Sequence, residues 1–113
     1  MPRDTNGLGD IFGGWLMSHA DIAGSIRAYR RAGGKVVTVA VENFSFLKPV
    51  YVGDVVSFFS RIDRVGTTSL KVVVEVYAER PGPGPAEEIR VAEGGLTYVH
   101  IGDDRRPRPV PAE

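Results

Sequence analysis

The spacing of the apolar residues changes once along this chain, and this change constrains the fold more than any other feature. From Asp10 to Ala32, bulky residues recur at alternating steps of three and four, the spacing of one α-helical face. Gly33 and Gly34 end that pattern, and from Lys35 onward apolar residues alternate with polar ones, as in β-strands. The sequence therefore predicts one N-terminal helix followed only by strands.

Four segments after the helix show this alternation. They are residues 35–42 (extended past a bend by 44–47), 53–65, 69–80 and 88–101. Residues 66–68 are a predicted hairpin turn, and 81–85 (PGPGP) a predicted loop. Gly94 and Gly95 predict a bulge or a close approach of another backbone inside the last strand. Short connections favour an antiparallel sheet, so the fold class is α+β.

The helix carries one bulky stripe that we expect to be buried on this sheet. Its members are Phe12, Trp15, His19, Ile22, Ile26 and Tyr29. The whole chain, residues 1–113, is predicted to be a single domain. Residues 1–9 form an irregular lead-in, and residues 103–113 a polar, proline-rich tail in solvent.

Composition excludes several function classes. The chain has no cysteine and only two histidines, which excludes thiolate catalysis and disfavours a histidine-bound catalytic zinc. Lys and Arg number 14, as do Asp and Glu, so no net charge favours binding to nucleic acid or to an anionic membrane. No apolar run is long enough to span a bilayer. We therefore expect a cytoplasmic protein with no metal, for which oligomerisation adds stability to a modest core.

Asp21 is the first candidate for chemistry, because aspartate is a poor helix former placed here in mid-helix. Its neighbours at helical spacing are mostly small: Gly14, Met17, Ser18, Gly24, Ser25 and Ala28. A carboxylate on such a face would lie in a cleft or at a subunit interface. The alternative is an ordinary solvated carboxylate.

Four other features have both a functional and a structural interpretation. The amide of Asn6 would orient a water or a carbonyl oxygen, or it is a turn residue. The free N–H groups at Gly13 and Gly14 would receive an oxyanion, or these glycines allow close packing. His19 is more typical of a hydrogen-bonded core or interface residue than of a catalyst.

The fourth feature is the tip of the hairpin. It brings together cationic and hydroxyl side chains that would grip a phosphate, namely Arg64, Thr67, Thr68, Ser69 and Lys71. The alternative is an ordinary polar hairpin end.

The chain also resembles the YciA-type acyl-CoA thioesterases of the hot-dog superfamily. The most specific block contains Asp4-Thr5-Asn6 and Gly9-Asp10-Ile11-Phe12-Gly13-Gly14. The similarity covers residues 1–21, 31–41, 46–50, 52–56, 65–71, 97–99 and 106–111. It implies a hot-dog fold, in which a curved antiparallel sheet wraps a long central helix.

The resemblance implies hydrolysis of acyl-CoA thioesters to a free acid and coenzyme A, with no cofactor or metal. It assigns the catalytic carboxylate to Asp21 and the asparagine to Asn6 of the other subunit of a homodimer. The helix start at Gly13 and Gly14 would face the thioester carbonyl. The hairpin tip, from Gly66 to Lys71, would lie near the nucleotide of coenzyme A, and Met17 near the acyl chain. The assembly expected from the family is a trimer of dimers, a hexamer.

The chain also departs from the family pattern. The family has a strand before the first conserved block, so we expect that edge strand to be truncated or missing here. Thr67 stands where the family often has arginine, and Gly94-Gly95-Leu96 replaces bulkier residues. Two alternatives stay open: an acyl-CoA binding or sensing protein without turnover, and a hydratase acting on enoyl thioesters. Hydratases of this superfamily use an aspartate and a histidine as a pair, whereas His19 and Asp21 are predicted to face different sides of the helix.

Overall fold

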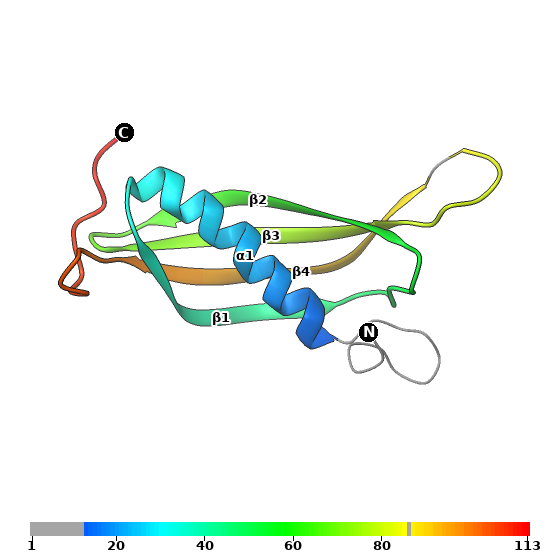
Figure 1. Ribbon diagram of the computed structural model, residues 1–113, viewed down its shortest axis with the longest axis horizontal. Helices are drawn as coiled ribbons and strands as arrows, with labels where there is room; N and C mark the ends of the chain where they lie inside the picture. The colour runs from blue at the N-terminus through cyan, green and yellow to red at the C-terminus, as the bar shows by residue number, and fades with distance from the viewer. Residues whose placement is uncertain (1–12, 86) are drawn as a thin grey trace.

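The computed structural model describes residues 13–85 and 87–113, in which one helix lies against one sheet (Figure 1). The elements are α1 (Gly13–Ala32), β1 (Val36–Phe46), β2 (Val55–Val65), β3 (Ser69–Glu79) and β4 (Glu88–His100). The predicted order of one helix and four strands is confirmed, as is the α+β class. The helix ends where Gly33 adopts a φ of 76°, a left-handed conformation that favours glycine.

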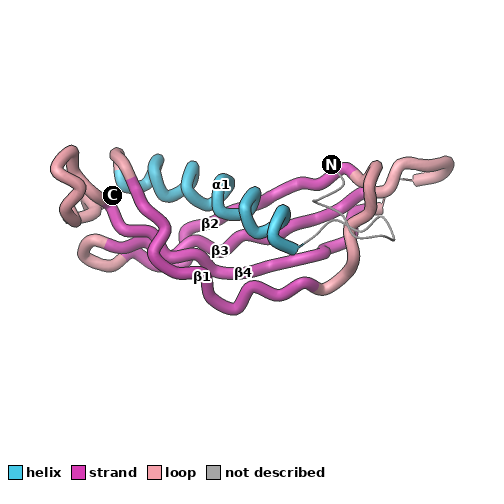
Figure 2. Tube along the Cα trace, turned by 60° about the horizontal axis from the view of Figure 1, so that its bottom comes forward, coloured by secondary structure: helices cyan, strands magenta, loops and turns pink. Residues whose placement is uncertain are grey.

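The four strands form a single antiparallel sheet in the order β1-β4-β3-β2. Successive strands β2, β3 and β4 are neighbours, whereas the chain crosses from one edge of the sheet to the other between β1 and β2. Helix α1 runs diagonally across one face of the curved sheet, and no element of the described chain covers the other face (Figure 2). This arrangement is the predicted helix wrapped by a sheet.

The core lies between α1 and the sheet, and a different helix face from the predicted one lines it. The buried helical residues recur every fourth position: Leu16, Ala20, Gly24, Ala28 and Ala32. Opposite them lie alternate residues of β3, whose exposed fractions are 0–2%: Leu70, Val72, Val74, Val76 and Ala78. The other residues of β3 face the uncovered side of the sheet.

The expectation that the bulky helical stripe packs on the sheet is wrong for its C-terminal half. Ile22, Ile26 and Tyr29 are 58%, 50% and 55% exposed in this single chain. The physical reason is the short distance between helix and sheet. A Cβ added to Gly24 would lie 2.5 Å from the Tyr98 hydroxyl, so no larger side chain fits where the helix meets β4 at this residue.

The predicted close approach at Gly94 is confirmed. On β1, Glu42 pairs with Gly95 and Ser45 with Glu93, so two β1 residues lie opposite Gly94 in a bulge. A Cβ on Gly94 would collide with the Phe44 ring and lie 2.8 Å from the Phe44 Cα. Glycine at this position therefore allows the bulge to pack against β4.

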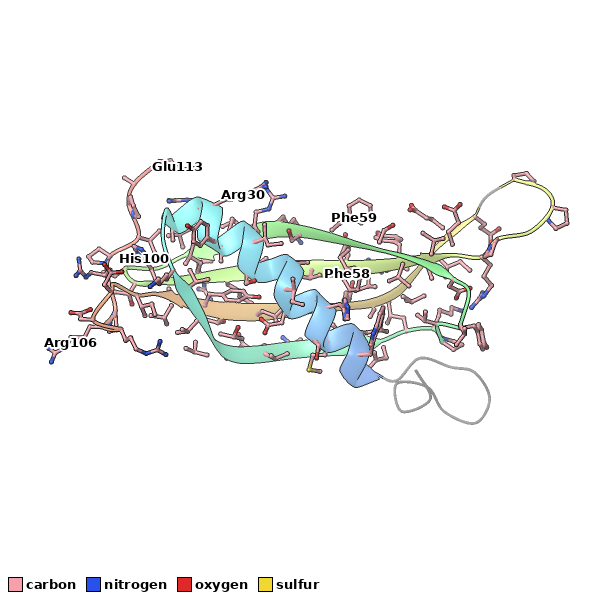
Figure 3. All side chains as sticks on the ribbon, viewed as in Figure 1. Arg30, Phe58, Phe59, His100, Arg106 and Glu113 are labelled. Atoms are coloured by element: carbon pink, nitrogen blue, oxygen red, sulfur yellow. The ribbon has the colours of Figure 1, made fainter. Side chains whose placement is uncertain are left out.

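The C-terminal segment does not extend into solvent as predicted, although most of its side chains are exposed. Its backbone folds back, with the Arg108 N–H donating to the His100 carbonyl and the Val110 N–H to the Thr67 carbonyl, both at 2.8 Å. The Arg31 guanidinium donates to the Pro111 carbonyl at 2.7 Å, which ties this segment to the end of α1. Figure 3 shows His100 and Arg106 at the same end of the molecule as Arg30.

Candidate active site

Asp21 lies at the margin between α1 and the sheet, where two strands supply donors to its carboxylate. The Thr38 hydroxyl of β1 donates to Oδ1 at 2.8 Å. The Tyr98 hydroxyl of β4 is 2.9 Å from the same Oδ1 and 2.9 Å from the Asp21 carbonyl oxygen, so its proton is shared between them. In residues 13–85 and 87–113, no donor contacts the second oxygen, Oδ2. Asp21 is half-buried, which contradicts the interpretation as an ordinary solvated carboxylate.

Tyr98 has no exposed surface. Burial, followed by the hydrogen bond to the Asp21 carboxylate, raises the pKa of Tyr98 well above its usual range. The phenol therefore stays protonated and remains a donor at every pH at which an enzyme works. The Tyr98 hydroxyl can therefore donate to Asp21 throughout this pH range.

The sequence analysis missed both partners of Asp21. Thr38 and Tyr98 lie directly opposite each other in the β1–β4 register, which brings the two donors to one place. A weak signal was available for Tyr98, because a buried tyrosine on an apolar strand face usually finds a partner for its hydroxyl. No signal pointed to Asp21 as that partner, since the two residues are 77 positions apart.

Gly13 and Gly14 form the first turn of α1, as expected, so their N–H groups have no partner within the helix. At a rise of about 1.5 Å per residue, Gly14 lies about 10 Å from Asp21 along the helix axis. One thioester carbonyl cannot contact both groups in the same chain. Met17 is half-buried on the turn between them. Asn6 lies outside the residues that the structure describes.

His19 is engaged elsewhere. Its Nδ1 lies 3.0 Å from the Trp15 carbonyl oxygen, and its ring stacks on Trp15 and, at 6.1 Å between centroids, on Phe58 of β2. Figure 3 shows Phe58 beside the helix, whereas Phe59, the next residue along β2, is 52% exposed. The prediction of a hydrogen-bonded histidine is confirmed, and His19 and Asp21 face different strands.

The hairpin tip holds a surface cavity of about 300 Å³. Its lining includes four predicted binding residues, Arg64, Gly66, Ser69 and Lys71, together with Glu42 and Thr97. The Lys71 ammonium lies 3.8 Å from a Glu42 carboxylate oxygen, so one of the two cations that line the cavity already has an anionic partner.

Two further predicted binding residues are not part of that lining. The Thr67 carbonyl accepts from Val110, and the Thr68 carbonyl accepts from the His100 N–H at 2.9 Å. Their backbones hold the hairpin to β4 and to the C-terminal segment. Their expected contact with substrate is not visible in this single chain.

The sheet separates this cavity from Asp21. Lys71 and Thr97 pair with each other across β3 and β4, and each lies between residues that face the helix. Asp21 lies on the helix side and the cavity on the other. The structure therefore brings together four of the predicted binding residues at the hairpin tip, but within one chain it joins neither Gly13 and Gly14 nor this cavity to Asp21.

In the part of the chain that the structure describes, neither a metal centre nor a membrane helix is found. Residues 13–85 and 87–113 contain no group of three or more potential metal ligands. In the same part of the chain, the helix is too polar to cross a bilayer. The predicted absence of metal and cofactor stays a prediction.

The overall arrangement of this chain also occurs in known proteins. Residues 8–84 match the family model described as the thioesterase superfamily. This chain belongs to that superfamily. Within it, the chain is 46% identical to the acyl-CoA thioester hydrolase YciA of Escherichia coli, with 100% of this chain and 86% of the relative aligned. The predicted YciA-type thioesterase family and hot-dog fold are confirmed.

Solved structures of superfamily members agree with this placement. A hexameric thioesterase from Yersinia pestis is 46% identical with a TM-score of 0.91, over 99% of this chain and 90% of that one. An acyl-CoA hydrolase from Staphylococcus aureus, solved with butyryl-coenzyme A and coenzyme A, is 33% identical with a TM-score of 0.90, over 99% and 67%. Alanine variants of that hydrolase have been made at an aspartate and at a threonine 17 residues later.

Proposed function

We propose that this protein is an acyl-CoA thioester hydrolase that works through Asp21. The observation that carries this proposal is the geometry of one carboxylate. Asp21 is half-buried, two hydroxyl donors hold its Oδ1, and its Oδ2 has no donor in the described residues. The separation of 17 residues between Asp21 and Thr38 equals that of the aspartate and threonine exchanged in the Staphylococcus aureus hydrolase.

Asp21 acts as a general base in this proposal. Its carboxylate takes a proton from a water molecule, whose oxygen bonds to the thioester carbonyl carbon. The resulting tetrahedral oxyanion collapses and breaks the C–S bond. Coenzyme A leaves as thiolate and takes up the proton from Asp21. A thiolate is a good leaving group, so no strong general acid is required.

Direct attack by Asp21 is the alternative route. Its carboxylate oxygen then bonds to the carbonyl carbon, the C–S bond breaks, and water hydrolyses the resulting mixed anhydride. A single turnover in heavy-oxygen water identifies direct attack when the label is found in Asp21. The label enters Asp21 only if the anhydride forms and water attacks on the aspartyl side. General-base catalysis places the label in the released acid alone.

The oxyanion requires donors, and the N–H groups at Gly13 and Gly14 are suited to supply them. Because they lie about 10 Å from Asp21 in the same chain, they act together with Asp21 of a second chain. A homodimer is therefore the minimal active unit. In it, Asn6 from the chain that supplies the N–H groups orients the water near Asp21.

The hairpin-tip cavity is suited to the phosphates of coenzyme A. Arg64 and Lys71 provide cations, and Ser69 provides a hydroxyl group. The sheet separates this cavity from Asp21 of the same chain, so one acyl-CoA molecule uses groups from more than one chain. A hexamer, the assembly named for several relatives, would supply them if it is arranged as a trimer of dimers.

Thiol release tests the function directly. Short-, medium- and long-chain acyl-CoA are supplied to the wild-type protein and to Asp21→Ala, with Asp63→Ala as a control carboxylate that lies exposed in β2. We expect thiol release by wild type and Asp63→Ala and none by Asp21→Ala. No release by a folded wild-type protein that binds coenzyme A would favour the non-catalytic binding protein. Full activity in Asp21→Ala would remove Asp21 from its role.

A further inference from the structure

We propose that Tyr98 is a positioning residue for the reaction: it holds Asp21 through Oδ1, so that Oδ2 alone is presented to the substrate side. This inference rests on the proposed function, because it assigns Tyr98 a role only through Asp21. Nothing in the family-level similarity requires it. It follows from contacts between α1, β1 and β4.

A carboxylate on a helix normally rotates about its side-chain torsions and presents either oxygen. Asp21 cannot do so freely, because Thr38 and Tyr98 both donate to Oδ1, at 2.8 and 2.9 Å. Rotation that exchanged the two oxygens would break both hydrogen bonds before new ones formed. One oxygen is therefore held, and the other remains available to accept a proton or to attack.

Tyr98 differs from Thr38 in how firmly its hydroxyl is placed. Thr38 is exposed on the edge strand β1, whereas Tyr98 has no exposed surface and belongs to an inner strand. Its hydroxyl also lies 2.9 Å from the Asp21 carbonyl oxygen, so it contacts both the backbone and the side chain of the same residue. Burial and the neighbouring carboxylate raise the pKa of Tyr98, which keeps the donor proton in place.

The helix sequence accommodates this contact. Gly24 lies one turn after Asp21 on the buried face, and a Cβ there would lie 2.5 Å from the Tyr98 hydroxyl. The absence of a side chain at this position gives the hydroxyl the space from which it reaches Asp21. Gly24 is therefore required for the hydrogen bond between Tyr98 and Asp21.

The test compares kcat and KM of Tyr98→Phe, Thr38→Val and the double variant, measured by thiol release from butyryl-CoA. We expect Tyr98→Phe to lower kcat by about 10- to 100-fold with KM changed by less than about twofold, since an orienting bond to the reacting group is lost. Thr38→Val lowers kcat less, and the double variant falls below either. A loss in kcat without a change in KM indicates positioning rather than a general loss of structure.

Tyr77→Phe is the matched control, because it removes a phenol from β3 on the opposite face of the sheet, where its ring contacts Phe59. It should leave kcat unchanged. Denaturant unfolding of each variant confirms that the protein measured is folded. If Tyr98→Phe unfolds, Gly24→Ala, whose added Cβ would lie 2.5 Å from the same hydroxyl, is measured in its place.

The outcomes separate the two proposals. If Asp21→Ala is inactive while folded Tyr98→Phe retains wild-type kcat, the positioning role of Tyr98 is wrong and the role of Asp21 stands. If Asp21→Ala retains wild-type kcat, the proposed function of Asp21 fails, and the role of Tyr98 fails with it. A change in KM alone for Tyr98→Phe would also overturn the positioning role.

Discussion

Gly24→Ala is expected to destabilise the protein, although alanine is the better helix former. The new Cβ would lie 2.5 Å from the Tyr98 hydroxyl and 3.3 and 3.4 Å from two ring carbons. The hydroxyl cannot move away freely, because Tyr98 is fully buried and donates to Asp21. Either the helix shifts from the sheet or the hydrogen bond breaks.

The magnitude follows from three opposing effects. Alanine in place of glycine in a helix interior stabilises by about 1 kcal/mol. Overpacking of a filled core costs about 1–3 kcal/mol. Loss of a hydrogen bond to a charged group costs about 1.5–3 kcal/mol if the hydroxyl is displaced. Since either the overpacking or the lost hydrogen bond is offset by the helix preference for alanine, the net expectation is a destabilisation of up to about 2 kcal/mol.

Removal of the hydroxyl should reverse this effect. In a Tyr98→Phe background, the nearest atoms to the new Cβ are the ring carbons at 3.3 and 3.4 Å, which requires a shift of only tenths of an ångström. Gly24→Ala should then be neutral or stabilising by up to about 1 kcal/mol. The double-mutant cycle should give a coupling of about 2 kcal/mol.

Urea unfolding measures all four proteins. Trp15 is the single tryptophan and packs against the core, so its fluorescence reports unfolding. Protomer concentration is held constant, because the stability of an oligomer depends on it. Equal effects of Gly24→Ala in both backgrounds would refute the argument, since the Tyr98 hydroxyl would then not be the obstacle. A more stable Gly24→Ala in the wild-type background would refute it as well.

Two further predictions concern pH and charge. The pKa of Tyr98 is raised in the folded state, so the protonated phenol stabilises the fold. This contribution of Tyr98 to the free energy of unfolding is complete below about pH 10, the usual pKa of tyrosine. It is lost as the pH rises further, by up to about 1.4 kcal/mol per pH unit. Urea midpoints should fall more steeply above about pH 10 for wild type than for Tyr98→Phe, and parallel curves would contradict this. Lys71→Ala should raise KM for acyl-CoA about tenfold, equivalent to about 1.4 kcal/mol, with kcat little changed. Lys35→Ala removes an exposed lysine paired with Asp103 and should leave KM unchanged. Equal KM values for the two variants would show that Lys71 does not contribute to coenzyme A binding.

The alternation of residues predicted the secondary structure of the described chain well. Strand β3 alternates between buried and half-buried residues along its whole length, so local spacing alone located it. Gly33 and the proline-rich segment 81–85 marked ends of elements, because their backbone preferences are local. Asp21 was also recognisable in the sequence, since an aspartate in mid-helix destabilises the helix and no local contact explains its presence.

The helix face that packs on the sheet was not predictable in this way. Large apolar residues on one stripe favoured burial of Ile22 and Ile26, but the Tyr98 hydroxyl of the sheet leaves no space for a side chain at Gly24. Shape complementarity with a strand far along the chain selected the glycine and alanine face instead. The outward position of the large residues leaves an apolar surface in the single chain.

The helix, the strands, the antiparallel sheet and the presence of a candidate carboxylate follow from the order of residues alone, because they depend on residues close together in the chain. The contacts of Thr38 and Tyr98 with Asp21, and the position of the sheet between Asp21 and the cavity at the hairpin tip, arise only when the chain is folded. Those results depend on strand order and register, which join positions up to 77 residues apart. No local spacing encodes which of many polar side chains will meet once such strands are paired.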